Sequence, residues 1–201
     1  MRMMAAGLVA LLALQQAPAI EEEIVEPRTG LHFTTRQGDL SLLGVGVRTK
    51  TIFQVKVYTV ALYVADAALA GPLAVHKGKL DTPEFYRDLV WGDFEKLILM
   101  RFVRDATREQ VQQNFREALP SVNPARLDVF ASHMIATRAG QEYVIRWAPG
   151  GVLETSFAGQ INTPIVDKDF AAAVFGMWLG EYPIQADIKR DLVSRAPLLI
   201  H

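Results

Sequence analysis

Two hydrophobic periodicities divide the chain between strands and helices. Alternating or continuous apolar runs rich in Val, Ile, Tyr, Phe and Thr are typical of strands. They predict strands over residues 31–35, 40–48, 51–64, 95–103, 142–148 and 152–158. The last two of these flank Pro149-Gly150-Gly151, which is a strong hairpin signal.

Apolar residues spaced three and four apart predict helices that begin near Thr82, Thr107 and Asn123, and helices over residues 167–179 and 186–194. The first three starts carry an N-cap side chain followed by proline or by a capping box. Strands dominate the first part of the chain, and there is no regular alternation of strand and helix. We therefore expect one α+β domain over residues 31–201, with an antiparallel sheet and helices packed on one face.

The N-terminus has the pattern of an export signal. Arg2 precedes an apolar run over residues 5–14, and Ala17-Pro18-Ala19 offers small residues for cleavage. This run is much shorter than the ~20 residues of a bilayer span. The pattern predicts a signal peptide over residues 1–19, a solvated acidic tail over residues 20–30, and a periplasmic or secreted protein without a stable membrane span.

Charge and residue content exclude several classes of function. The net charge is −1, and no stretch concentrates Lys and Arg, so nucleic-acid binding lacks the basic patch that it needs. The absence of cysteine excludes disulfides, thiolate catalysis and cysteine-ligated metals. The histidines show no metal-ligand spacing, so no metal site is predicted: His32, His76, His133 and His201.

Arg48 is the most informative single residue. It ends a glycine-punctuated apolar strand, Gly44-Val45-Gly46-Val47-Arg48. Glycine within a strand marks a bulge or the close approach of a backbone or ligand. The guanidinium either reaches water, pairs within the protein, or holds an anion, and the sequence pattern alone leaves these alternatives open.

Five short blocks follow one another between residues 30 and 195. They are Gly44 to Arg48, Lys56 to Val64, Phe94 to Leu97, Arg146 to Gly151 and Phe175 to Gly180. The ordered set resembles the chalcone-isomerase-like family, and most closely its bacterial, non-plant branch. The resemblance implies an open-faced sheet with a cleft between the sheet and its helices.

The resemblance also implies site residues. Its fatty-acid-binding members hold a carboxylate with the arginine after the glycines and the first tyrosine of the tyrosine-rich strand, which correspond here to Arg48 and Tyr58. The true isomerases use the same arginine with a threonine, here Thr59. Their tyrosine and two further polar cleft positions correspond to Val111, Ala118 and Met177, and these departures argue against flavanone-forming catalysis.

Adjacent strand residues face opposite sides of a sheet, so Tyr58 and Thr59 reach one cleft only if a bulge intervenes. The ligand-binding candidates are Arg48, Tyr58 and Thr59, with Arg48 and Thr59 catalytic if the protein is an isomerase. Our hypothesis is an exported, monomeric binding protein for a fatty acid or similar amphipathic carboxylate, with no cofactor. The alternatives are an isomerase of the intramolecular-lyase type, a haem-binding protein, and a structural domain with a closed core.

Overall fold

A computed structural model of the chain describes residues 22–50 and 53–201. Its main sheet is antiparallel, in the order β10-β8-β7-β6-β5-β4-β3, with β9 paired to β8. The five long strands are β4 (Leu40–Lys50), β5 (Val55–Ala65), β6 (Lys96–Phe102), β7 (Glu142–Ala148) and β8 (Val152–Phe157). The short ones are β3 (Arg36–Gln37), β9 (Gln160–Ile161) and β10 (Ile165–Val166).

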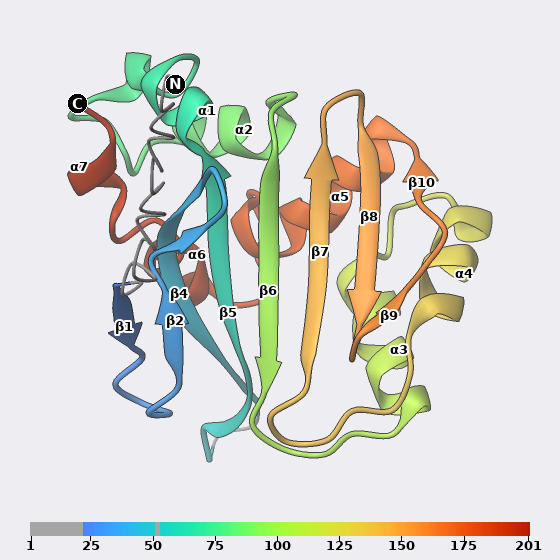
Figure 1. Ribbon diagram of the computed structural model, residues 1–201. Helices are drawn as coiled ribbons and strands as arrows, with labels where there is room; N and C mark the ends of the chain where they lie inside the picture. Colours follow the sequence, from blue (N-terminus) through green and yellow to red (C-terminus); the bar gives the residue numbers. More distant parts are fainter. Residues whose placement is uncertain (1–21, 51–52) are drawn as a thin grey trace, which may run out of the picture.

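Helices cover one face of this sheet, and a separate hairpin covers part of the other. In Figure 1, α2 and α5 lie behind the sheet and α3 and α4 at its right-hand side, while the hairpin of β1 (Glu23–Val25) and β2 (His32–Thr34) lies at the left, next to β4. The helices are α1 (Asp66–Ala70), α2 (Pro83–Trp91), α3 (Arg108–Ala118), α4 (Pro124–His133), α5 (Lys168–Leu179), α6 (Ala186–Asp191) and α7 (Ala196–Leu199), with a 3-10 turn at Ala74–His76. The predicted α+β class, with helices on one face of an antiparallel sheet, is confirmed.

Strand β5 contributes to both layers of the core because successive side chains point to opposite faces. Val60 and Leu62 are fully buried against the helices. Ala61 and Tyr63 are fully buried on the other face, where Phe33 of the hairpin packs over them. Both faces of this part of the strand are buried from solvent, which explains its nearly continuous apolar sequence.

Two predicted segments differ from the structure. The strand expected over residues 51–64 begins at Val55, because Phe53 and Gln54 form a turn in which Gln54 has a φ of 55°. Within the segment expected to be a solvated tail, residues 23–25 form β1, and Glu26 is buried beside Arg28. The signal peptide predicted over residues 1–19 lies outside the described residues.

No helix in the described part of the chain has the length and apolar character needed to cross a bilayer.

The glycines of β4 allow α6 to lie directly on the strand. A Cβ atom at Gly44 would lie 2.1 Å from the carbonyl oxygen of Asp191, and one at Gly46 would lie 3.2 Å from the Cα of Ile188. A register shift between Leu42 and Gly44 adds a bulge at the same place. The close approach anticipated from the sequence is therefore made by the protein's own helix, which fixes the end of β4 that carries Arg48.

Lys96 is buried with its ammonium inside the protein. It donates to three carbonyls at the C-terminal end of α2, those of Leu89 (2.9 Å), Val90 (2.8 Å) and Gly92 (2.8 Å). The ammonium also lies 4.0 Å from the centre of the Trp147 ring. A cation at this helix end satisfies carbonyls that the helix leaves unpaired, so Lys96 connects β6 to α2.

We predict that Gly44→Ala lowers the free energy of unfolding by about 3 kcal/mol, because the added methyl overlaps the α6 backbone. The control is Gly176→Ala in α5, where a Cβ meets nothing within 4 Å; it is expected to stabilise the protein by about 0.5–1 kcal/mol. Urea unfolding of both variants measures the difference. Equal stabilities would contradict the proposed contact with α6.

We predict that Lys96→Met destabilises the protein by about 2 kcal/mol, because it leaves buried carbonyls without a donor. Burial lowers the pKa of Lys96 from 10.5 to about 7. Between these values the unfolded chain binds more protons than the folded one, so wild-type stability rises with pH in that window. In urea unfolding from pH 7 to pH 10.5, the free energy of unfolding of wild type should rise relative to that of Lys96→Met. Lys79→Met, which changes an exposed lysine, is the control and should show the same pH dependence as wild type. Parallel curves for wild type and Lys96→Met would contradict the linkage.

Candidate functional site

A cleft of about 190 Å³ lies between strands β4 and β5 and helices α3 and α5. Apolar and aromatic side chains form one part of its wall, and charged or hydrogen-bonding groups form the other. The lining residues are Arg48, Lys50, Val57, Tyr58, Asn114, Phe115, Glu117, Ala118, Met177, Trp178 and Ile184. The cleft is therefore the place in the fold where a cationic strand end meets an apolar helix layer.

A bulge in β5 determines which side chains reach the cleft. Arg48 is paired with Tyr58, but the next residue of β4, Thr49, is paired with Lys56, so Val57 is the extra residue. Side chains on both sides of such an irregularity can face the same way, and both Val57 and Tyr58 line the cleft. The sequence analysis required a bulge for Tyr58 and Thr59 to reach one cleft. A bulge is present, but it lies at Val57, one residue before this pair.

Thr59 lies on the opposite side of the sheet from the cleft. It is fully buried, and its hydroxyl donates to the carbonyl of Arg101 at 3.2 Å. From Tyr58 onward the pairing of β5 with β6 is regular, so alternation sends Thr59 away from the helices. The structure brings Arg48 and Tyr58 together and leaves Thr59 as a packing residue behind them.

The guanidinium of Arg48 is half-buried and bonded to neutral groups. Its Nη1 donates to the carbonyl of Ile184 at 3.1 Å and to the amide oxygen of Gln185 at 3.2 Å. In the described part of the chain no carboxylate forms an ion pair with it, although Glu117 lines the same cleft. The positive charge is thus hydrogen-bonded but not neutralised, and it faces a partly apolar space.

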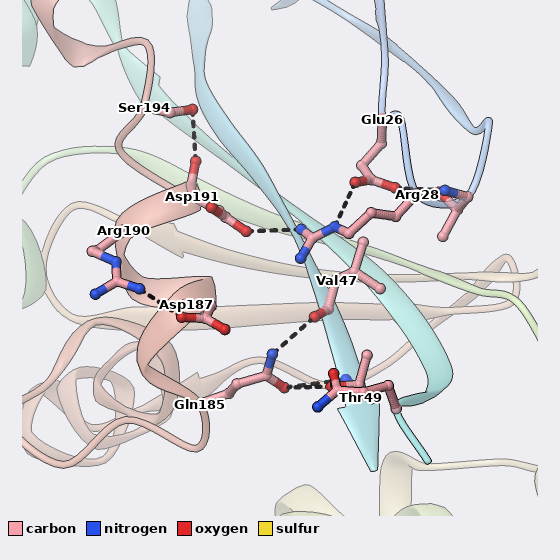
Figure 2. A network of polar contacts seen from close by, with 11 residues as sticks. Glu26, Arg28, Val47, Thr49, Gln185, Asp187, Arg190, Asp191 and Ser194 are labelled. Atoms are coloured by element: carbon pink, nitrogen blue, oxygen red, sulfur yellow. Dashed lines mark hydrogen bonds and ion pairs between the residues drawn. The ribbon is translucent and has the colours of Figure 1, made fainter. Parts of the chain in front are cut away.

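The side-chain amide of Gln185 holds Arg48 in place, because it also bonds to the backbone of β4 on either side of Arg48, as a neighbouring strand would. It accepts from the backbone N–H of Thr49 at 3.1 Å and donates to the carbonyl of Val47 at 3.3 Å. Figure 2 shows this amide bridging to the edge of β4, next to the Arg28–Asp191 contact that attaches the first hairpin to α6. The unpaired edge of β4 is closed by α6 and by the residue that precedes it.

Tyr58 presents a neutral hydroxyl beside this charge. The indole N–H of Trp178 donates to its oxygen at 3.2 Å. Burial raises the pKa of Tyr58 to about 12, against the opposing effects of the Trp178 hydrogen bond and the Arg48 charge. Since Trp178 occupies the acceptor side and no acceptor for the phenolic proton is found among the described residues, the hydroxyl can donate to a ligand in the cleft.

The other wall of the cleft is apolar. Phe115 and Trp178 meet edge to face, with ring centres 6.5 Å apart, and Met177 and Ala118 lie beside them. Ala118 and Met177 are two of the positions that the resemblance matched to polar groups of the isomerases. The third, Val111, is buried in the core and does not line the cleft.

Several residues of the site were not predicted from the sequence, among them Lys50, Asn114, Trp178 and Gln185. Trp178 lay in the predicted helix over residues 167–179 and in the block Phe175 to Gly180, but its N–H gave no signal of its own. Lys50 lies two residues after Arg48, and this spacing places both side chains on the same face of a strand, so the sequence could have indicated Lys50. Gln185 and Asn114 come from distant segments, and no pattern in the sequence connects them to β4.

The cleft does not fit a haem. Its volume is below the ~300–1,000 Å³ of pockets that hold drug-sized molecules. The histidines in the described part of the chain lie elsewhere, with His32 beside Glu23, His76 beside Asp88 and His133 beside Thr155.

Comparison with known families agrees with the resemblance seen in the sequence. The family model described as chalcone isomerase-like matches residues 28–194. The chain belongs to the chalcone isomerase-like family. This match covers the whole sheet and the helices that form the cleft, so the cleft is part of the family's shared domain.

Relatives in this family carry both of the functions that the resemblance implied. The chain is 29% identical to a chalcone–flavanone isomerase of Phaseolus vulgaris over 183 residues, which cover 79% of this chain and 83% of that protein. It is 26% identical to fatty-acid-binding protein 2 of Arabidopsis thaliana over 196 residues, 84% of this chain and 49% of that protein.

A solved structure supports the fold independently. The crystal structure of an Arabidopsis thaliana fatty-acid-binding protein superposes with a TM-score of 0.76. The alignment covers 89% of this chain and 99% of that one, at 21% sequence identity. At this identity the likeness establishes the chalcone isomerase-like fold, and the choice between binding and catalysis depends on the side chains of the cleft.

Proposed function

We propose that the protein binds a fatty acid or a similar amphipathic carboxylate in the cleft, with its acid group on Arg48 and Tyr58. The observation that carries this proposal is the guanidinium of Arg48, which lines an apolar cleft and is bonded only to neutral acceptors among the described residues. A carboxylate accepting from this guanidinium and from the Tyr58 hydroxyl would neutralise the charge through short, charge-assisted hydrogen bonds.

The apolar wall accounts for the rest of the ligand. Phe115, Met177 and Trp178 offer contact to an alkyl chain, and each buried methylene contributes about 0.8 kcal/mol. A cleft of about 190 Å³ holds the head group and the first part of a chain. The relatives that are named as fatty-acid-binding proteins support this reading.

Isomerase activity is the second candidate, because several relatives are named chalcone–flavanone isomerases. Ring closure requires donors and a proton route placed around the reacting atoms. The cleft supplies Arg48 and Tyr58, but Ala118 and Met177 present no such donors, and Thr59 faces away. These side chains favour holding a ligand over converting it.

The proposal is tested by calorimetric titration with straight-chain acids from butanoate to dodecanoate. We expect affinity to rise by about fourfold per methylene until the chain leaves the cleft. Arg48→Gln should weaken binding by at least about tenfold, and Tyr58→Phe by about fivefold, because each removes a donor to the carboxylate.

The matched control is Thr59→Val on the same strand, which should leave affinity unchanged because its side chain lies behind the sheet. No binding by wild type, or equal binding by wild type and Arg48→Gln, would refute the proposal. Loss of binding in Thr59→Val with full binding in Tyr58→Phe would favour the isomerase arrangement, and a chalcone absorbance assay on the same proteins would then measure turnover.

We further propose that the protein is exported, on the strength of the charged start, apolar run and small residues within residues 1–19. The cleft would then meet its ligand outside the cytoplasm.

We predict that the mature protein begins at Ile20. Intact-mass measurement of the protein from the periplasmic or culture fraction checks this directly. Ala19→Arg should block processing, because a signal peptidase accepts small residues at this position, whereas Ala6→Leu keeps the run apolar and should be processed normally. A full-length protein confined to the cytoplasm would contradict the export proposal.

A further inference from the structure

A second cation lies in the cleft next to Arg48. Lys50 follows Arg48 by two positions on β4, so both side chains are on the same face, with Cα atoms roughly 7 Å apart. Both line the cleft. The proposed carboxylate contacts are made by Arg48 and Tyr58, and the Lys50 ammonium is a second cation in the same wall.

The ammonium of Lys50 is held by a neutral group. It bonds to the amide oxygen of Asn114 on α3, across the opening of the cleft. Glu117 is the one carboxylate in the cleft lining; it accepts a hydrogen bond from Gln113 at 2.9 Å along its own helix and forms no ion pair with Lys50 among the described residues. A neutral amide is a weaker partner for an ammonium than an anion is, so an anionic ligand group can replace Asn114.

Lys50 also marks the exit from the cleft. A second, larger groove of about 740 Å³ lies outside it and shares Lys50, Val57, Asn114 and Glu117 with the cleft. The rest of this outer groove is polar and mixed in charge, with Arg104 against Asp105 and Glu109, beside Val55, Ala106, Gln110 and Gln113. A ligand longer than the inner cleft would pass Lys50 and place its far end among polar groups.

The two observations restrict the ligand class. The inner cleft, at about 190 Å³, is small, and a bare methyl terminus would gain little from the polar groove beyond it. An anionic terminus at this point would meet the Lys50 ammonium where water still reaches it, so its desolvation cost is small. Arg48 and Lys50 therefore offer two cations, two residues apart on one strand face, against the single carboxylate, Glu117, that the described residues place in the cleft lining.

We propose that Lys50 is a specificity-determining residue and that the preferred ligand is a medium-chain acid with a second anionic group at its far end, such as an α,ω-dicarboxylate. This inference rests on the proposed carboxylate site at Arg48. One acid group binds Arg48 and Tyr58, and the alkyl chain contacts Phe115 and Trp178. The second acid group replaces the amide oxygen of Asn114 as the hydrogen-bond acceptor of the Lys50 ammonium.

The test compares octanedioate with octanoate by calorimetry at fixed, low ionic strength. For wild type we expect the diacid to bind about tenfold tighter, the effect of one additional charge-assisted contact. In Lys50→Met the ratio of the two affinities should fall to about one. Lys56→Met, which removes an exposed lysine of the neighbouring strand, should keep the wild-type ratio.

Further variants keep the result interpretable if Lys50→Met folds poorly. Asn114→Ala frees the ammonium and should raise the ratio, and added salt should lower it in wild type but not in Lys50→Met. A wild-type ratio of one or less, or an unchanged ratio in Lys50→Met, overturns the role of Lys50 while octanoate binding still supports the Arg48 site. If neither acid binds, the carboxylate site itself is refuted.

Discussion

The site depends on a guanidinium that the protein holds in place without neutralising. Arg48 is bonded to the carbonyl of Ile184 and the amide of Gln185, both neutral and both in the segment that leads into α6. An internal carboxylate would have stabilised the charge and closed the site. Neutral acceptors fix the direction of the side chain and leave its charge without an ion pair among the described residues.

Arg48 owes this position to glycines several residues before it. Gly44 and Gly46 let α6 approach β4 closely enough for Gln185 to bond the edge of the strand. The Arg28–Asp191 contact ties the first hairpin to the same helix (Figure 2). The packing of α6, the closure of the sheet edge and the orientation of Arg48 are therefore parts of one arrangement, and a change in any of them reaches the cleft.

A motif shared with a family need not mark a site. Arg48 and Tyr58 belong to matched blocks and line the cleft. Lys96 belongs to another block, yet its ammonium donates its hydrogen bonds to carbonyls at the end of α2 and does not line the cleft. Trp178 contributes to both the core and the cleft, because its ring is buried while its N–H donates to the Tyr58 hydroxyl. Only the hydrogen-bond partners separate these cases.

The sequence by itself determined the element types, the α+β class and the family, because hydrophobic period, caps and short motifs are local properties. Through the resemblance it also named Arg48, Tyr58 and Thr59 as candidate site residues. Tertiary structure decided which face each strand residue takes. A single extra residue at Val57 sends Tyr58 into the cleft and Thr59 behind the sheet. It also decided the partners of Arg48 and Lys50, since Gln185 and Asn114 are over 60 residues away in sequence and meet β4 only when helices pack on the sheet.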